Sequence, residues 1–358
     1  MRKDLNLFLE PNTNRSLHLE INKMQGEHII SGRLYNGRKY FPIIRGIPRF
    51  VDKSFYRDTT LRTPLKQTSH SFGKKWNEPR YRKLGYKKKD VAALGEQFMA
   101  VLGAGTLSEL KGILKKSGSV LNAGCGVAWS EYLFNYNPDV RRHCIDISLS
   151  VETAYERTKG FPNVIVSQAS IFALPYPDAY FDIIYSIGVI HHTPYPEKAF
   201  RALAKKLAPG GLMGVYIYNK KPFLREMADR EIRKITSKMS YDKCMSFSKC
   251  MTNMGRALSK IKKPITIDDD MDILGIKKGS YGLQRLVYDY FIKCWYDLGQ
   301  DRGYADLVNQ DWYHPHYASH HTKEEITGWF KKCGMMGIRV IQPKGWEHSG
   351  YFISGRKK

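Results

Sequence analysis

The sequence lacks the features that mark a secreted, zinc-ribbon or membrane-spanning protein. Its six cysteines, among 358 residues, form no Cys-x-x-Cys pair, which argues against a zinc site and against a disulfide framework. No apolar run approaches the ~18 residues of a membrane-spanning helix, and the first residues contain no apolar core of a signal peptide. We therefore expect a soluble, cytoplasmic protein with reduced thiols, no bound metal and no membrane partner.

Acidic residues are scarce relative to basic ones, 34 against 58, which gives a net charge of +24. Residues 1–90 carry 21 basic and 8 acidic side chains, whereas residues 101–218 carry 11 and 9. The segment 74–89, KKWNEPRYRKLGYKKK, interleaves lysine and arginine with aromatic residues. Such a mixture can bind phosphates and stack on bases, so RNA is one candidate partner, although a charge run can also be an ordinary solvated surface.

Turn and strand signals divide the first third of the chain into two parts. Residues 1–56 predict a small β module, because the runs HIISGRLY and KYFPII flank the turn signal Asn36-Gly37. Residues 57–118 begin with a polar, basic stretch that predicts a linker or a loop-rich lid rather than regular structure. Two helices are predicted at the end of this part, over residues 90–117.

From residue 119 onward, strand and helix patterns alternate. This order predicts an α/β fold with a parallel sheet covered on both faces. A capping box at Thr322 opens a helix to Cys333, and the two strands after it predict an antiparallel final pair. The predicted strands span residues 119–123, 141–148, 163–168, 181–187, 211–218, 337–342 and 350–355.

The core of this α/β domain is predicted to consist of residues 119–218 and 313–358. Between its two parts, residues 219–312 predict a mainly helical insertion that recognises the substrate. An aromatic helix is predicted within it over residues 283–298.

Small residues and one carboxylate mark a nucleotide site at the ends of the first two predicted strands. Gly124 and Gly126 let the backbone approach a ligand closely, and Asp146 is placed to accept hydrogen bonds from a ribose diol. A dinucleotide site would need a third glycine where Trp129 stands, and no G-x-x-x-x-G-K-[ST] motif is present. An adenosine ligand without a pyrophosphate fits both absences, and S-adenosylmethionine is such a ligand.

Four segments resemble, in order and spacing, the successive motifs of class I S-adenosylmethionine-dependent methyltransferases of the type 11-like group. They are VLNAGCG (120–126), CIDIS (144–148), QASIFALPYPDAYFDIIYSIGVIHH (168–192) and LAPGG (207–211). The resemblance implies a Rossmann-like, seven-stranded, mostly parallel sheet with an antiparallel last strand. It also implies S-adenosyl-L-methionine as the cofactor.

The same resemblance implies roles for individual residues. Gly124 and Gly126 would lie against the methionine part of the cofactor, Asp146 would bind its ribose, Ser170 and Ile171 would flank its adenine, and Ser186 would close the side of the fourth strand. The full set implied to bind the cofactor is Asn122, Gly124, Cys125, Gly126, Asp146, Ile147, Ser170, Ile171 and Ser186.

This sequence departs from the family pattern at three positions. Asn122 stands where an acidic residue is common, Ala128 where a third loop glycine is common, and Ser170 where an aspartate often binds the adenine amino group. These departures leave a non-catalytic, cofactor-binding relative open as one hypothesis.

The segment GRLYNGRKYFPIIRGIPRFV (32–51) resembles the small zinc-ribbon-like activator domain that accompanies some methyltransferases, in a form without its cysteines. The resemblance implies that residues 1–56 brace the catalytic domain and hold no zinc.

Histidines are the candidate proton acceptors, because methyl transfer needs a base only when the nucleophile carries a proton of high pKa. His191 and His192 follow the fourth strand of the α/β core, and His316 lies in the segment DWYHPHYASHHT before the last helix. These three residues are the predicted catalytic set. For His191 and His192, packing near the cofactor remains an equal alternative.

Three functions are compatible with the sequence. The leading hypothesis is methyl transfer to an oxygen or nitrogen of a small-molecule or glycan-type metabolite, and an anionic acceptor would also explain the basic surface. The second is an RNA methyltransferase or an RNA-binding relative, and the third is a protein that binds the cofactor without turnover.

Overall fold

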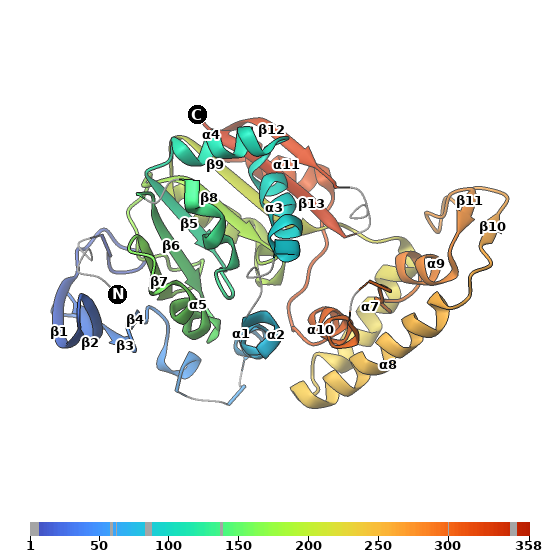
Figure 1. Ribbon diagram of the computed structural model, residues 1–358, viewed down its shortest axis with the longest axis horizontal. Coiled ribbons are helices and arrows are strands. Elements are labelled where there is room, and N and C mark those ends of the chain that lie inside the picture. The colour runs from blue at the N-terminus through green and yellow to red at the C-terminus, as the bar shows by residue number, and fades with distance from the viewer. Residues whose placement is uncertain are drawn as a thin grey trace.

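A seven-stranded sheet forms the centre of the protein. In chain order its strands are β5 (Ser119–Ala123), β6 (Arg141–Asp146), β7 (Val164–Gln168), β8 (Phe181–Ile187), β9 (Leu207–Tyr218), β12 (Met335–Ile341) and β13 (Gly350–Lys357). They lie side by side in the order β12, β13, β9, β8, β5, β6, β7 (Figure 1). All neighbours pair in parallel except β13, which runs antiparallel to both β9 and β12. The predicted Rossmann-like fold is confirmed.

This computed structural model describes residues 7–57, 60–61, 63–82, 88–136, 139–299, 301–343 and 349–358. Part of the predicted basic segment, residues 83–87, therefore lies outside the described residues.

Helices cover both faces of the sheet, which explains why its strands read as nearly continuous apolar runs. Along β5, Val120 packs on one side with residues of α3 and α4, while Leu121 packs on the other with residues of α6 and α11. The covering helices are α3 (Lys88–Leu102), α4 (Leu107–Lys115), α5 (Ser150–Thr158), α6 (Pro196–Lys206) and α11 (Lys323–Lys332). The two helices predicted over residues 90–117 are α3 and α4.

The amino-terminal part is a four-stranded antiparallel sheet followed by a short 3₁₀ turn, Lys53–Phe55. Its strands are β1 (His18–Gln25), β2 (His28–Tyr35), β3 (Tyr40–Ile44) and β4 (Ile47–Pro48). After β4 the chain runs alongside β7, the edge strand of the large sheet. Arg49 forms an isolated parallel bridge with Gln168, and Phe50 N donates to Gln168 O at 2.7 Å. The Arg49 guanidinium bonds the Gln168 side chain at 3.0 Å and ion-pairs with Glu152. The small module thereby covers the edge strand β7.

Helix α1 (Pro64–Asn77) corrects the prediction of a linker or loop-rich lid after residue 57. The hydroxyl of Thr63 accepts a hydrogen bond from Lys66 N at 3.3 Å, and Pro64 occupies the first helical position. Proline breaks a helix interior but suits its first turn, where its missing N–H has no intrahelical partner. A short helix, α2 (Pro79–Arg82), follows, and α1 lies over the carboxyl ends of the strands (Figure 1).

The insertion between β9 and α11 is mainly helical, as predicted. It contains α7 (Phe223–Thr236), α8 (Tyr241–Ser259), a hairpin of β10 (Ile265–Ile267) and β11 (Gly279–Tyr281), α9 (Leu283–Tyr290) and α10 (Arg302–Tyr313). The helix predicted through residue 298 ends at Tyr290. Beyond it, Trp295 N donates to the Asn309 side chain at 2.9 Å, and that side chain donates to Trp295 O at 3.0 Å. These backbone groups are therefore hydrogen-bonded without a helix.

None of the helices in the described ranges has the length and apolar character needed to cross a bilayer.

His143 on β6 makes folding sensitive to acid. Its ring is buried among Tyr176 and Phe181, with centroids 5.0 and 5.4 Å away, and neither ring nitrogen has a hydrogen-bond partner in the described part of the chain. Burial, assisted by the charge of Arg141, lowers the pKa of His143 from 6.5 to about 3. Between these values the unfolded chain binds the proton and the folded chain does not, so the free energy of unfolding falls as the pH drops below 6.5.

We expect His143→Phe to reduce this sensitivity, because phenylalanine fits the same aromatic surroundings and does not titrate. The gain relative to the wild type should reach about 2 kcal/mol at pH 5 and shrink towards pH 7.5, as urea unfolding at a series of pH values would measure. His18→Gln, at an exposed position of β1, serves as the control. Equal pH slopes for wild type and His143→Phe would contradict the expectation.

Candidate functional site

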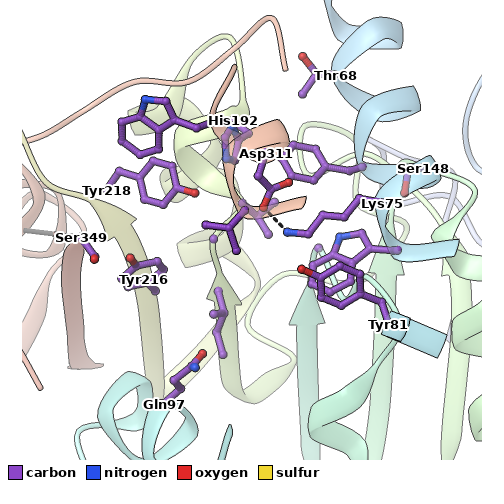
Figure 2. A pocket seen from close by; sticks show the side chains of 18 of the residues that line it. Thr68, Lys75, Tyr81, Gln97, Ser148, His192, Tyr216, Tyr218, Asp311 and Ser349 are labelled. Atoms are coloured by element: carbon purple, nitrogen blue, oxygen red, sulfur yellow. Dashed lines mark hydrogen bonds and ion pairs between the residues drawn. The ribbon is translucent and has the colours of Figure 1, made fainter. Parts of the chain in front are cut away.

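A cavity of about 880 Å³ opens at the carboxyl ends of β5, β6 and β8 and extends under α1 and into the helical insertion. Strand β5 has β6, the next strand along the chain, as its neighbour on one side and β8 as its neighbour on the other. The strand order therefore reverses at β5. Ligands of open α/β sheets bind at such a reversal of strand order. Figure 2 shows Ser148 and Tyr81 on one side of the cavity and Tyr216, Tyr218 and Ser349 on the other.

The loop after β5 forms a cradle that only glycine permits. Gly124 has φ 81°, and a Cβ there would lie 2.3 Å from a methyl group of Val189. Gly126 has φ 53°, and its Cβ would lie 2.9 Å from the indole of Trp76 on α1. Gly124 lines the cavity, while Gly126 lies just behind the lining and donates its N–H to Asp146 Oδ2 at 3.0 Å.

Asp146, at the end of β6, lines the cavity with a partly exposed side chain. Its Oδ1 accepts hydrogen bonds from Ser148 N at 2.8 Å and from Ser148 Oγ at 2.7 Å. Burial raises the pKa of Asp146, and these hydrogen bonds oppose that rise. The carboxylate is thus fixed in orientation at the cavity wall, where it can accept further hydrogen bonds from a diol.

Most residues that the sequence predicts for the cofactor come together around the same cavity. Ser186 does not line it, because its side chain is fully buried and donates to Ala123 O at 2.8 Å. The predicted residues that do line it are Asn122, Gly124, Cys125, Asp146, Ile147, Ser170 and Ile171. A cradle limited to glycine, followed by an aspartate at the next strand end, fits the sulfonium nucleoside that the sequence predicts.

Glu131, which the sequence analysis missed, does not itself line the cavity but holds Asn122, which does. It lies in the 3₁₀ segment Trp129–Tyr136, and its side chain is 1% exposed. Asn122 Nδ2 donates to Glu131 Oε1 at 3.2 Å, and Tyr185 OH donates to the same oxygen at 2.9 Å. A carboxylate therefore stands beside Asn122, the position where the family pattern has an acidic residue.

Ala128 keeps the backbone geometry of the glycine it replaces. Its φ is 52°, in the left-handed region that favours glycine, and its N–H donates to Cys125 O at 2.8 Å. This departure from the family pattern therefore leaves the loop conformation typical of glycine in place.

His192 lines the cavity, whereas His191 does not. His192 Nδ1 donates to Tyr317 O at 2.7 Å, which leaves the lone pair on Nε2. Burial lowers the pKa of His192 to about 3, so the ring is a neutral hydrogen-bond acceptor near pH 7. His191 is fully buried and stacks on Tyr218 at 3.8 Å, so it supports a residue of the cavity wall.

His316 is exposed and does not line the cavity. Its segment contributes to the site in a different way, because Tyr317 O orients His192. His320, in the same segment, is held by Glu226, whose carboxylate oxygens lie 2.8 and 2.9 Å from His320 Nδ1.

Helices α1 and α10 meet across the cavity through one ion pair. Lys75 on α1 pairs with Asp311 on α10, and both side chains line the cavity (Figure 2). The Lys75 ammonium lies 4.5 Å from the Trp76 ring centroid and 5.2 Å from that of Tyr81. These aromatic and basic residues of the segment 74–89 therefore face the cavity.

No group of three or more histidine, cysteine or acidic side chains in the described residues is arranged to hold a metal ion.

Sequence comparison identifies relatives of the region that builds the cradle. Residues 121–215 match the family described as a methyltransferase domain (Methyltransf_11). A phosphoethanolamine N-methyltransferase of Triticum aestivum is 32% identical over 132 residues, which cover 36% of this chain and 26% of that protein. The 27-O-demethylrifamycin SV methyltransferase of Amycolatopsis mediterranei is 31% identical over 106 residues, which cover 28% of this chain and 39% of that protein.

The alignments thus span only 26% and 39% of the length of these two relatives. Among solved structures, the N-methyltransferase NodS of Bradyrhizobium japonicum in complex with S-adenosyl-L-homocysteine aligns with a TM-score of 0.41 at 12% identity. That alignment covers 81% of this chain and 98% of the other.

Proposed function

We propose that this chain, in which residues 121–215 match the methyltransferase-domain family and lie in a seven-stranded sheet, transfers the methyl group of S-adenosylmethionine to an oxygen or nitrogen of a small-molecule acceptor. One observation carries the proposal: the glycine cradle and Asp146 line the same cavity as polar and aromatic side chains of the helical insertion. A single cavity can therefore hold a cofactor and an acceptor side by side.

When bound, the cofactor supplies the activated methyl group. The Gly124 backbone and Asp146 would bind it, and Ser170 and Ile171 would border its adenine, since all four line the cavity. Helix α1 excludes water from the loop, because Trp76 packs directly over Gly126. His192 would accept a hydrogen bond from the nucleophile through Nε2 and so orient it.

A compact acceptor suits this site better than RNA does. The segment 74–89 suggested a nucleic-acid surface, yet Lys75 pairs with Asp311 and Trp76 packs on the glycine loop inside the cavity. The names of the two relatives support small acceptors as well, since they point to phosphoethanolamine and to a demethylrifamycin. RNA retention that weakens steeply with salt would favour the RNA alternative.

The carboxylate of Glu131 beside Asn122 bears on the third hypothesis, a cofactor-binding protein without turnover. Its hydrogen bond fixes the Asn122 amide at the cavity wall, so a polar group of defined orientation remains where the family pattern has an acidic residue.

Calorimetric titration with S-adenosylmethionine and S-adenosylhomocysteine tests the proposal. We expect both to bind, and we expect transfer of a radiolabelled methyl group to at least one member of a panel of hydroxyl- and amine-bearing small molecules. Absence of binding for both nucleosides would overturn the proposal. Binding without any transfer would favour the third hypothesis.

A further inference from the structure

The cavity opens to solvent through the helical insertion. Among the described residues that line it, the three exposed ones are Arg285, Asp297 and Leu298. Leu298 is 67% exposed although it borders the cavity. Ser259, the last residue of α8, also lines the cavity. The mouth of the cavity therefore lies between the end of α8 and the segment that follows α9.

The end of α8 packs directly against that segment. A Cβ at Gly255 would lie 2.2 Å from Cys294 O and 3.1 Å from Tyr296 Cβ, so the two pieces of chain are in contact. Ile261, which is 51% exposed, follows α8 at this end. Four exposed basic side chains lie around it: Arg256, Lys260, Lys262 and Lys263. These four residues, Ile261 and Leu298 are called the mouth patch.

The basic side chains of the mouth patch are not balanced by nearby carboxylates. Residues 256–263 contain no acidic residue, and within the described ranges none of the four cations forms an ion pair. Lys262 Nζ donates to a backbone oxygen at 3.1 Å. In the β10–β11 hairpin beyond, Asp270 and Asp272 are paired with Lys277 at 3.0 and 2.7 Å. The mouth patch therefore presents net positive charge to solvent.

Exposed apolar side chains are concentrated on the insertion as well. Of the nineteen large apolar side chains that are exposed in the described residues, ten lie between residues 223 and 298, about a fifth of the chain. In the mouth patch, Ile261 and Leu298 stand among the cations. Single-stranded nucleic acid would call for aromatic side chains that stack on bases, and the mouth patch has none. Aliphatic side chains among lysines are instead typical of surfaces that bind anionic lipids.

We propose that the mouth patch docks the protein onto an anionic lipid surface, with Ile261 and Leu298 entering the headgroup region and the four cations contacting lipid phosphates. This orientation would present the mouth of the cavity to the lipid. Attraction between exposed charges fades beyond a Debye length of about 8 Å at physiological ionic strength, so only cations near the contact contribute. Lys249 and Lys243, on the same helix, lie about 16 and 25 Å from Lys260 along the helix axis.

Co-sedimentation of the whole protein with vesicles tests the proposal. The vesicles consist of phosphatidylcholine alone or of an equal mixture of phosphatidylcholine and phosphatidylglycerol. We expect the wild type to bind the mixture, to bind more weakly as salt is added, and to leave phosphatidylcholine vesicles in the supernatant. The double variant Lys262→Glu, Lys263→Glu should weaken binding to the mixture about tenfold or more.

The matched control is the double variant Lys243→Glu, Lys249→Glu, which reverses two exposed charges on α8 away from the mouth patch. It should change binding to the mixture less than about threefold. The double variant Ile261→Ser, Leu298→Ser keeps every charge and should weaken binding several-fold, because apolar insertion is lost. All six side chains are exposed, so melting temperatures near that of the wild type are expected for the three variants.

Four results would overturn the proposal. They are absence of binding to the mixed vesicles, equal losses for the two lysine variants, undiminished binding by the serine variant, and retention of single-stranded RNA without binding to vesicles, which would assign the mouth patch to RNA. The experiment involves no methyl transfer, so its outcome is independent of the proposed function.

Discussion

Replacing Asp146 with alanine is expected to weaken the binding of S-adenosylhomocysteine about 100-fold, since hydrogen bonds to a charged group are worth about 1.5–3 kcal/mol each. Asp146 lines the cavity and is held rigidly by Gly126 N and by two hydrogen bonds from Ser148. Its loss would remove the acceptor that we propose for the ribose diol and would free the N–H of Gly126. Calorimetric titration of wild type and Asp146→Ala measures the effect.

Asp182→Ala is the matched control. Asp182 also receives backbone hydrogen bonds next to β5, from Gly118 N at 2.8 Å and Ser119 N at 2.9 Å, but at the opposite end of that strand. It does not line the cavity. We therefore expect Asp182→Ala to lower the melting temperature while the dissociation constant for S-adenosylhomocysteine stays unchanged.

The two variants separate ribose binding from general stability. If Asp146→Ala binds as tightly as the wild type, then Asp146 only holds the loop and the assignment of its role is wrong. If both variants lose binding to the same extent, the effect is one of folding, and the ribose assignment loses its support.

The central sheet could be predicted from the sequence because its strands are buried on both faces. Apolar runs such as 119–123 and 181–187 therefore stand out from their polar flanks, and they coincide with β5 and β8. The carboxyl ends of β5 and β6 meet at one edge of the sheet, which explains why Gly124 and Asp146 could be grouped from their positions alone.

Helix α1 was missed because the polar, basic stretch after residue 57 was interpreted as a linker or a loop-rich lid. Thr63, directly before Pro64, is the available signal, since a threonine cap followed by proline is a common helix start. Missing this helix also left unpredicted the position of Trp76 over Gly126 of the glycine loop.

Contacts between residues distant in sequence account for the rest of what the sequence did not reveal. Glu131 becomes relevant only because its segment folds back onto Asn122, nine positions earlier. Lys221 precedes α7 and Lys293 follows α9, yet both ammonium groups lie over the ring of Trp312. Nothing in local periodicity or spacing signals such a meeting.

Replacing His192 with alanine is expected to lower kcat about 10- to 100-fold while the dissociation constant for S-adenosylhomocysteine stays within about threefold. In the proposed function the ring would orient the nucleophile through Nε2, because Nδ1 is committed to Tyr317 O. The expected loss lies at the low end for acid–base groups, since burial lowers the pKa of His192 to about 3 and makes it a weak base. For the same reason, protonation of His192 should not reduce kcat between pH 5 and 8.

His191→Ala and His316→Ala complete the test, because the sequence assigned all three histidines to catalysis. His191 is buried and stacked on Tyr218, so its loss should lower the melting temperature more than His192→Ala does. His316 lies outside the cavity lining, so a large fall in kcat for His316→Ala would restore it to the catalytic set. A wild-type kcat for His192→Ala, at saturating acceptor, would instead assign that ring to packing, because an orienting group contributes only when it touches the nucleophile.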